Sequence, residues 1–279
     1  MVIKNNQMTN HLEQATAISK QENYLFEFSI CTLVTRKEEY NEMMDSFIKK
    51  GFTTDCCEYL YIDNSEKCTF DAYQGLNIFL QKAQGKYVIL CHQDIILHDN
   101  NKVDLLEMIA DVKQKDNKWA VLANAGGVNL KWIATHITQN SGRVITEEHW
   151  PLRVKTVDEN FIVVKKSANL ALSKNLSGFH FYGTDLCLIA DILGYTSYVI
   201  GFNLTHKSNG KIDQSFYDSK KAIKSKYKIA LRKRFVTTTF SKICFTGNTF
   251  QFFAFNTGFI LFFVRQYYKF LTKKKDYQI

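Results

Sequence analysis

The sequence predicts an α/β fold with a central sheet of mainly parallel strands. In residues 85–97, GKYVILCHQDIIL, a turn glycine opens an apolar run that ends at a polar triplet. Such a run is typical of a strand buried on both faces. Strand-like and helix-like patterns also alternate at short spacing from residue 26 onward. This alternation indicates a doubly wound sheet whose parallel strands are joined by right-handed crossover helices.

Each element is predicted from its own pattern. Apolar residues alternate in the strands and recur at helical spacing in the helices. Gly51 and Gly85 end two of the helices. In order we expect a strand at 26–34, a helix at 37–50, a strand at 58–62, a helix at 71–84, the buried strand from Gly85, a helix at 103–112, a strand at 119–123, irregular chain at 128–157, a strand at 161–164, a helix at 186–193 and a strand at 197–202.

Length and composition allow one large α/β domain with an appendage. The chain has 279 residues, of which 46% are hydrophobic, so a sizeable core is possible. Residues 1–22 are polar and aperiodic, so we expect a flexible extension and no secretory signal. The seven cysteines form no C-x-x-C pair. They are expected to be reduced core thiols of a cytosolic protein.

The positive charge is concentrated at one end. Residues 211–279 hold 15 Lys and Arg against 3 Asp and Glu, whereas residues 1–210 hold 21 against 24. Basic tails bind nucleic acid or anionic membrane. The aromatic residues of this tail lie in uncharged runs and do not alternate with its lysines, which argues against nucleic acid. We therefore expect residues 211–279 to form a basic, aromatic, membrane-associating region.

The longest uncharged run of the tail lies between Lys242 and Arg265 and has 22 residues. That length is close to what a bilayer-spanning helix needs. Polar residues and two glycines interrupt it, so a helical segment lying in the membrane interface is favoured. A single-pass anchor and an amphipathic helix packed on the catalytic domain are the alternatives.

A polar triplet, His92-Gln93-Asp94, follows the buried strand. Ligands of α/β sheets bind at the carboxyl ends of the strands. A carboxylate there can hold a hard cation, and the cation can hold a diphosphate. The alternative is that Asp94 only caps the next turn.

Several motifs resemble family 2 glycosyltransferases. The resemblance covers about residues 26–210 and rests on Asp63-Asn64-Ser65, Asn77, Ala83-Gln84-Gly85-Lys86-Tyr87-Val88, His92-Gln93-Asp94, Phe181-Tyr182-Gly183-Thr184-Asp185 and His206. It implies the nucleotide-sugar-binding GT-A sandwich over residues 23–210. It also implies transfer of a sugar from a nucleotide diphosphate donor with inversion. Where the family has Asp-x-Asp, this chain has His92 in place of the first acid.

The resemblance also implies roles for individual residues. It gives a divalent metal, Mn²⁺ or Mg²⁺, held by Asp94, His206 and His92, and it gives Asp185 as the base for the acceptor hydroxyl. Glu159 and His180 are further candidates for the base. The alternative for Asp185 is a purely structural role as a helix N-cap. The expected nucleotide-sugar contacts are Thr35, Asp63, Asn124, Gly126, Asp158 and Gln93.

The expected function is a glycosyltransferase of surface polysaccharide assembly. Its partners would be a nucleotide diphosphate sugar, a glycan or lipid-linked acceptor and an anionic membrane surface, with no nucleic acid. It would lie peripherally at the cytoplasmic face of the cell membrane. The main alternative is a GT-A-like module that binds a nucleotide sugar or glycan without turnover. No G-x-G-x-x-G is present, and Thr35-Arg36-Lys37 is not the glycine-rich loop of a nucleotidyltransferase.

Overall fold

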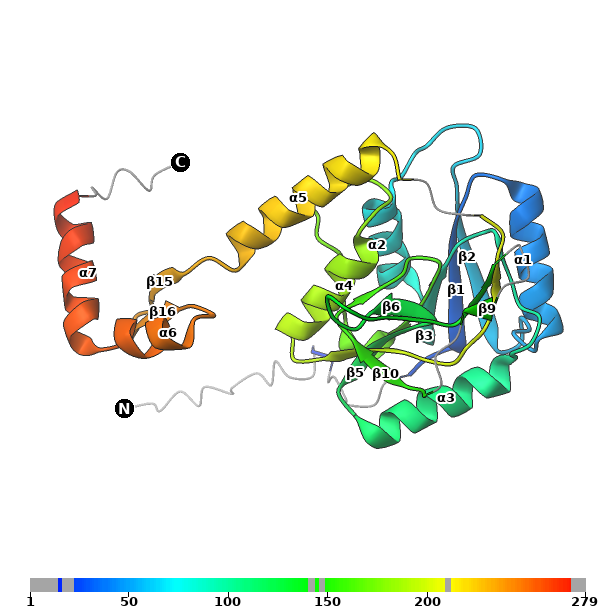
Figure 1. Cartoon of the computed structure of the whole chain (residues 1–279), viewed down its shortest axis with the longest axis horizontal. Helices are drawn as coiled ribbons and strands as arrows, with labels where there is room; N and C mark the ends of the chain where they lie inside the picture. The colour runs from blue at the N-terminus through cyan, green and yellow to red at the C-terminus, as the bar shows by residue number, and fades with distance from the viewer. Residues whose placement is uncertain (1–14, 17–22, 140–143, 146–148, 209–211, 272–279) are drawn as a thin grey trace, which may run out of the picture. The chain divides into compact units, whose positions relative to one another are not determined.

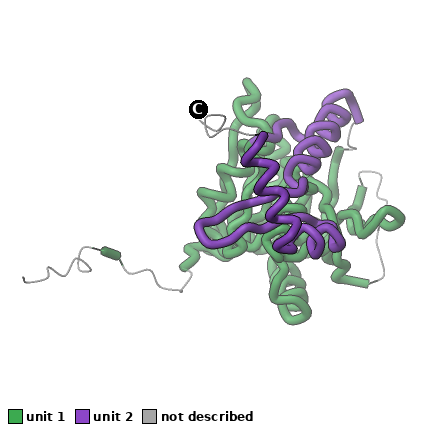
Figure 2. Tube along the Cα trace, turned by 90° about the vertical axis from the view of Figure 1, so that its left-hand side faces the viewer, with its two compact units in different colours: residues 1–174, 182–211 green, residues 175–181, 212–279 purple. Residues whose placement is uncertain are grey.

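The computed structural model describes residues 15–16, 23–139, 144–145, 149–208 and 212–271 (Figure 1). The expected extension, residues 1–22, therefore lies almost wholly outside the described residues. The chain divides into two compact units, coloured separately in Figure 2. Unit 1 comprises Met1–Lys174 and Tyr182–Lys211, and unit 2 comprises Asn175–Phe181 and Ile212–Ile279.

Unit 1 is built on a seven-stranded sheet. In spatial order its strands are β10 (Leu152–Val154), β13 (Thr196–Val199), β5 (Trp119–Ala123), β12 (Phe161–Lys165), β3 (Gly85–Cys91), β1 (Phe26–Val34) and β2 (Cys57–Asp63). β2, β1 and β3 are mutually parallel, and β13 is parallel to β5. The α/β class with a large central sheet is thus confirmed.

The sheet is mixed, in agreement with the expectation of a mainly parallel sheet, and the sequence did not indicate which strands are antiparallel. β12 lies antiparallel between β3 and β5, and β10 is antiparallel to β13. The reason is connectivity. Among the described residues no helix separates β5 from β12. The chain therefore turns back beyond the carboxyl end of β5 and returns as the neighbouring antiparallel strand β12. A parallel strand would need a crossover connection.

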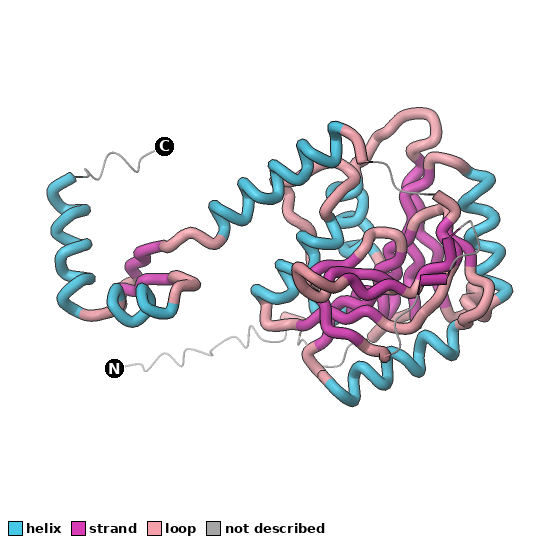
Figure 3. Tube along the Cα trace, in the orientation of Figure 1, coloured by secondary structure: helices cyan, strands magenta, loops and turns pink. Residues whose placement is uncertain are grey.

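Helices cover both faces of this sheet (Figures 1 and 3). α1 (Lys37–Lys49) and α3 (Lys102–Lys115) bury their apolar stripes in one core cluster with strand residues such as Ile30, Ile89 and Phe161. α2 (Ala72–Lys82) and α4 (Tyr182–Ile192) contact β1 and β13 respectively. Gly85 starts β3 without a side chain because a Cβ there would lie 2.5 Å from the Ser29 backbone nitrogen.

Short strands fill the stretch that was expected to be irregular. They are β7 (Ile133–Thr135), β8 (Ile137–Gln139), β9 (Val144–Ile145) and β11 (Thr156–Val157), together with β10 of the large sheet. The short strands β4 (Ile95–Ile96), β6 (Ala125–Gly127) and β14 (Thr205–His206), from outside this stretch, pair with them. They form two small sheets, β11-β6-β7 and β4-β14-β8-β9. Strands of two or three residues are too short for their alternation to stand out in a sequence. The expectation for 128–157 was therefore wrong.

Unit 2 consists of helices and one hairpin. α5 (Gln214–Ala230) starts at Asp213, whose side chain accepts hydrogen bonds from the backbone nitrogens of Ser215 and Phe216. The antiparallel hairpin β15 (Arg234–Thr237) and β16 (Lys242–Phe245) follows, and then α6 (Thr249–Phe255) and α7 (Gly258–Leu271). Within the described part of the chain, no helix has both the length and the apolarity to cross a membrane.

Candidate functional site

Two strands bring His92, Asp94 and His206 to one place. β3 ends at Cys91, and His92 to Asp94 follow directly. The next strand, β4, is antiparallel to β14, with Ile95 opposite His206. The backbone nitrogen of Lys207 also donates to the carbonyl oxygen of Asp94 at 3.0 Å. This short ladder brings Asp94 and His206 together, although more than one hundred residues separate them in the sequence.

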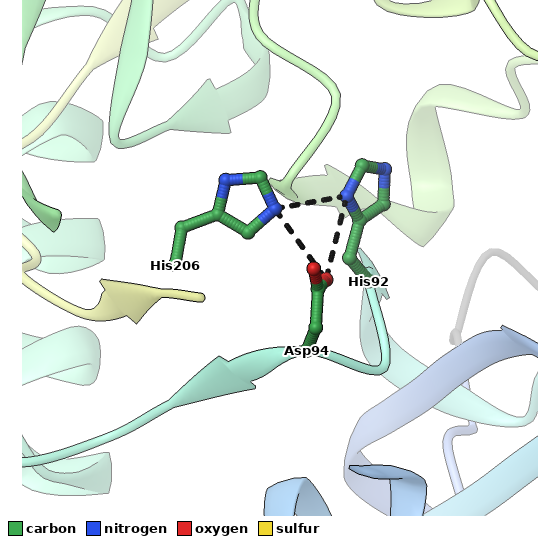
Figure 4. Close-up of side chains that lie close together, drawn as sticks. All are labelled: His92, Asp94 and His206. Carbon is green, nitrogen blue, oxygen red and sulfur yellow. Dashed lines mark hydrogen bonds and ion pairs between the residues drawn. The ribbon is translucent and has the colours of Figure 1, made fainter. Parts of the chain in front are cut away.

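The three side chains point toward one another (Figure 4). Asp94 Oδ1 lies 3.4 Å from His206 Nε2 and 3.9 Å from His92 Nδ1. The two imidazole nitrogens are 3.4 Å apart. These separations exceed a charge-assisted hydrogen bond, and they suit three ligands around one cation at roughly 2.1 Å, a usual bond length for nitrogen and oxygen ligands. The donor set and its spacing therefore fit a divalent metal.

The tautomer of His92 suits the same role. Tyr182 donates its hydroxyl hydrogen to the carbonyl oxygen of Glu159 at 2.9 Å. The Tyr182 hydroxyl oxygen itself lies 3.0 Å from His92 Nε2. His92 Nε2 therefore donates to Tyr182, which leaves a lone pair on Nδ1. Burial, and then the nearby His206, lower the pKa of His92. A neutral imidazole whose second nitrogen is held by a hydrogen bond is the form that binds metals.

Asp94 is ionised in this setting. Its side chain is 7% exposed. Burial raises the pKa of Asp94, but the interactions with His206 and Ser208 outweigh burial and bring the pKa below its ordinary range. The carboxylate is therefore ready to bind a cation without first losing a proton.

Gln93 joins the ends of β1 and β3. Its Oε1 accepts hydrogen bonds from the backbone nitrogens of Thr35, at 2.8 Å, and Arg36, at 2.9 Å. Its Nε2 donates to Thr35 Oγ1 at 2.8 Å. Gln93 is buried, and both polar ends of its amide are engaged. These contacts fix the loop after β1 beside the candidate metal ligands, so Gln93 positions this loop.

The two carboxylates expected to contact the nucleotide have local partners. Asp63 pairs with Lys37 Nζ at 2.9 Å and accepts from the backbone nitrogen of Ser65. The hydrogen bond from Lys37 is the largest cause of the lowered pKa of Asp63. Asp158 is exposed and accepts from the backbone nitrogen of Asn160 at 3.1 Å. The charge of Asp158 also raises the pKa of His92 to a minor extent.

Asn124 and Gly126 lie at the end of β5 and in β6. Asn124 is fully buried, and neither polar atom of its side chain has a hydrogen-bond partner. Gly126 has no room for a side chain, because a Cβ there would collide with the carbonyl oxygen of Thr156 in β11. Packing between β6 and β11 therefore explains this glycine by itself.

Asp185 and Glu159 differ sharply in exposure. Asp185 is fully buried in α4, and its two carboxylate oxygens accept from the backbone nitrogen and the hydroxyl of Ser173, both at 2.8 Å. Glu159 is half-buried and adjoins the start of α4, where the Gly183 nitrogen donates to its Oε1 at 3.4 Å. The contacts of Asp185 therefore hold the loop before α4. His180, the remaining candidate base, belongs to unit 2 and contacts Ser215 there.

Tyr182 and Ser208 have contacts at the site that the sequence did not reveal. Tyr182 holds His92, and the Ser208 hydroxyl lies 3.3 Å from His206 Nε2. Tyr182 lies in the motif 181–185, but nothing in that motif indicates that its hydroxyl contacts His92. Ser208 follows His206 by two residues, which is the only hint that the sequence offers for it.

Some solved structures have a similar architecture. No protein-family model matches the sequence. GalNAc-T7 with UDP, GalNAc and Mn²⁺ is similar over 68% of this chain and 45% of its own, with 11% identity and a TM-score of 0.48. S. aureus TarS (1–349) is similar over 65% of this chain and 60% of its own, with 13% identity and a TM-score of 0.43. This chain thus spans less than two thirds of either structure, and similarity at this level identifies neither an activity nor a ligand.

A curated relative is much more similar in sequence. It is the protein named ATP synthase subunits region ORF 6 of Fuscovulum blasticum, which is 33% identical over 207 residues. The matched part is 72% of this chain and 83% of that protein. The name states no activity. The chain belongs to the family of this Fuscovulum blasticum protein.

Proposed function

We propose that the protein is a metal-dependent glycosyltransferase that moves a sugar from a nucleotide diphosphate sugar to an acceptor hydroxyl. The observation that carries this proposal is the cluster of His92 Nδ1, Asp94 Oδ1 and His206 Nε2 at the carboxyl end of the central strand. Next to the cluster, Gln93 fixes the loop that follows β1. A cation site beside a fixed loop at this edge of an α/β sheet suits a nucleotide diphosphate.

Mn²⁺ fits the cluster better than Mg²⁺. Two imidazole nitrogens and one carboxylate oxygen are offered. Mg²⁺ prefers oxygen ligands and water, whereas imidazole suits transition metal ions. A bound cation would neutralise the charge that develops on the leaving diphosphate. Thr35 and Asp63, at the ends of the neighbouring strands β1 and β2, are the proposed contacts of the nucleotide.

Glu159 is the better-placed base for the acceptor. A base must reach the proton that it removes. Glu159 is half-buried, and its backbone carbonyl accepts from Tyr182, which also contacts His92, so its chain position lies close to the cluster. Asp185, in contrast, lies inside the protein with both carboxylate oxygens bonded to Ser173. The roles then divide, with Glu159 taking the proton and Asp185 holding the loop before α4. Asp158 remains the proposed contact of the sugar.

The finer points of the proposal rest on the resemblance to family 2. They are an inverting transfer, a glycan or lipid-linked acceptor, and a place in surface polysaccharide assembly at the cytoplasmic face of the membrane. An inverting transfer needs one base and no covalent intermediate, and Glu159 is the proposed base.

The first test is binding. Calorimetric titration of UDP and of GDP, with and without Mn²⁺, should show metal-dependent binding to the native chain. Asp94→Ala should abolish the metal-dependent part, whereas Asp111→Ala, an exposed carboxylate of α3, should not. If Asp94→Ala retains metal-dependent affinity, the cluster is not the metal site.

The second test is turnover. Release of the nucleoside diphosphate from a panel of nucleotide sugars should fall by ~10²-fold or more in Glu159→Gln, the usual scale for a lost general base. Donor binding should persist. A comparable loss in Asp185→Asn, with Glu159→Gln near normal, would return the base to Asp185. Binding without any turnover in the native chain would favour the module that only binds.

A further inference from the structure

The last two helices of unit 2 bury none of their residues. Neither α6 nor α7 has a buried side chain. Their exposed aromatic residues include Phe250, Phe252, Phe253, Phe259, Phe262, Phe263, Tyr267 and Phe270. Phe250, Phe259 and Phe270 are 80%, 70% and 78% exposed. Exposed apolar surface gathered in this way marks a site of association.

This surface belongs to a folded piece of chain. Asn256, between α6 and α7, accepts from the Cys244 nitrogen at 2.8 Å and donates to the Cys244 carbonyl at 3.0 Å, which ties the helices to β16. Cys244 is fully buried. The Lys233 ammonium lies 4.2 Å from the centroid of the Phe255 ring. The aromatic side chains therefore stand on a defined support.

The hairpin and α7 line a cavity of about 400 Å³ that is open to solvent on one side. Leu261, Val264, Arg265 and Tyr268 line it from one face of α7, and Phe235, Val236, Thr237, Lys242 and Ile243 line it from the hairpin. The lining is thus mostly apolar, with two cations. Phe259, Phe262 and Phe263 are not among these residues and remain exposed.

The charge around this surface has one sign. Residues 219–271 contain eleven Lys and Arg and no Asp or Glu. Two copies of such a surface would repel each other, which disfavours self-association. Aromatic side chains beside cations are typical of segments that lie in the interface of an anionic bilayer. Among the described helices none could span one.

We propose that unit 2 docks on an anionic phospholipid bilayer and that the cavity between the hairpin and α7 seats one lipid of that bilayer. The apolar lining takes part of an acyl chain, and Lys242 and Arg265 bind the phosphate. The exposed phenylalanines of α6 and α7 enter the interface. This proposal does not depend on the transfer chemistry, because lipid binding needs neither donor nor metal.

The bilayer is tested by flotation of the full chain. The chain should float with vesicles of phosphatidylcholine mixed with phosphatidylglycerol and not with phosphatidylcholine alone. Phe259→Ser/Phe262→Ser/Phe263→Ser should weaken flotation by at least about tenfold, because buried aromatic surface is lost. Equal flotation with both vesicle types, none with either, or an unchanged triple variant would overturn the docking. A chain that dimerises through unit 2 and does not float would show a protein interface instead.

The seat is tested with a short-chain, monomeric phosphatidylglycerol. Calorimetry should show one lipid bound per chain, and Lys242→Gln/Arg265→Gln should remove that binding. Lys220→Gln/Lys221→Gln on α5 removes the same charge from the same unit and should leave it intact. Equal losses in the two double variants would mean attraction by net charge alone. Binding of UDP or inorganic phosphate in place of the lipid would also exclude the seat.

Discussion

At the scale of single residues, the candidate site depends on side chains that fix the position of others. Gln93 accepts hydrogen bonds from two backbone N–H groups of the loop after β1. Tyr182 sets the tautomer of His92. Neither needs to touch a substrate to matter, because ligands and loops must be held in place before they can bind.

Gln93→Leu should destabilise the fold and weaken donor binding together. The backbone nitrogens of Thr35 and Arg36 would lose their acceptor, at a cost of about 1–3 kcal/mol for each group left unpaired. Gln93→Glu keeps an acceptor in place and should be milder in both respects. Urea denaturation and nucleotide titration measure the two effects, and equal behaviour of the two variants would contradict the positioning role.

Tyr182→Phe should lower metal affinity, and it should also reduce stability because the Glu159 carbonyl oxygen loses its hydrogen-bond donor. The variant removes the hydroxyl that His92 Nε2 contacts, and lost outer partners of metal ligands typically cost 10–100-fold in affinity. Titration with Mn²⁺ measures it. Tyr61→Phe, on an exposed tyrosine, serves as the control. An unchanged affinity would show that Tyr182 does not orient His92.

Some of these site residues could be predicted from the sequence and others could not, for physical reasons. Asp94 and His92 stand out because they interrupt apolar surroundings at the end of a strand. His206 carries no such contrast, and only the resemblance pointed to it. The contact of Tyr182 with His92 depends on where α4 docks on the sheet, which local periodicity does not encode.

At the scale of elements, short ladders join parts that are distant in sequence. β4 and β14 are two residues each, yet their pairing brings His206 to Asp94 and His92 and completes the candidate metal site. The long apolar strands and the amphipathic helices were predictable because their periodicity extends over many residues. The antiparallel direction of β12 was not, because direction follows from the connection before a strand and not from its own pattern.

The stability that the contacts between α3 and β13 contribute should depend on pH. Asp116, at the end of α3, accepts from Thr196 Oγ1 at 2.5 Å and from the Tyr198 hydroxyl at 2.9 Å. The hydrogen bond from Thr196 is the largest cause of the lowered pKa of Asp116. A carboxyl whose pKa is lower in the folded state stabilises the protein above its unfolded pKa, about 4. That contribution is lost as pH falls through the folded pKa.

Asp116→Asn should therefore lower the urea midpoint at neutral pH, and the difference from the native chain should shrink below about pH 4. Denaturation curves across this range give the result. Asp111→Asn, on an exposed carboxylate of the same helix, is the matched variant. A difference that stays constant with pH would mean that the charge of Asp116 does not matter.

At the scale of the whole molecule, the segment Asn175–Phe181 belongs with α5 in unit 2. The Phe181 and Phe216 rings are 4.9 Å apart, His180 Nε2 lies 3.2 Å from Ser215 Oγ, and Lys226 donates to Asn175. The tail was expected as a separate region over residues 211–279. The addition of 175–181 could not be foreseen, because nothing in that short stretch marks its partner.

A chain that ends after residue 211 should thus become sensitive to protease at the start of the segment 175–181. Without α5, this segment loses the partners named above, and trypsin should cut at Lys174 in a partly opened loop. Mass spectrometry of timed digests shows the site. In the full chain, Phe216→Ser should give an intermediate rate, and protection of Lys174 in the shortened chain would contradict the pairing.

The interleaving of the two units has a genetic consequence. The chain passes between them at 174/175, at 181/182 and again at 211/212. A single recombination at residue 211 would transfer the tail but leave behind the seven residues that pack on it. Loop and tail therefore have to be inherited together. A hybrid gene that joins this α/β unit to the tail of a distant relative would need to carry that relative's version of 175–181 as well.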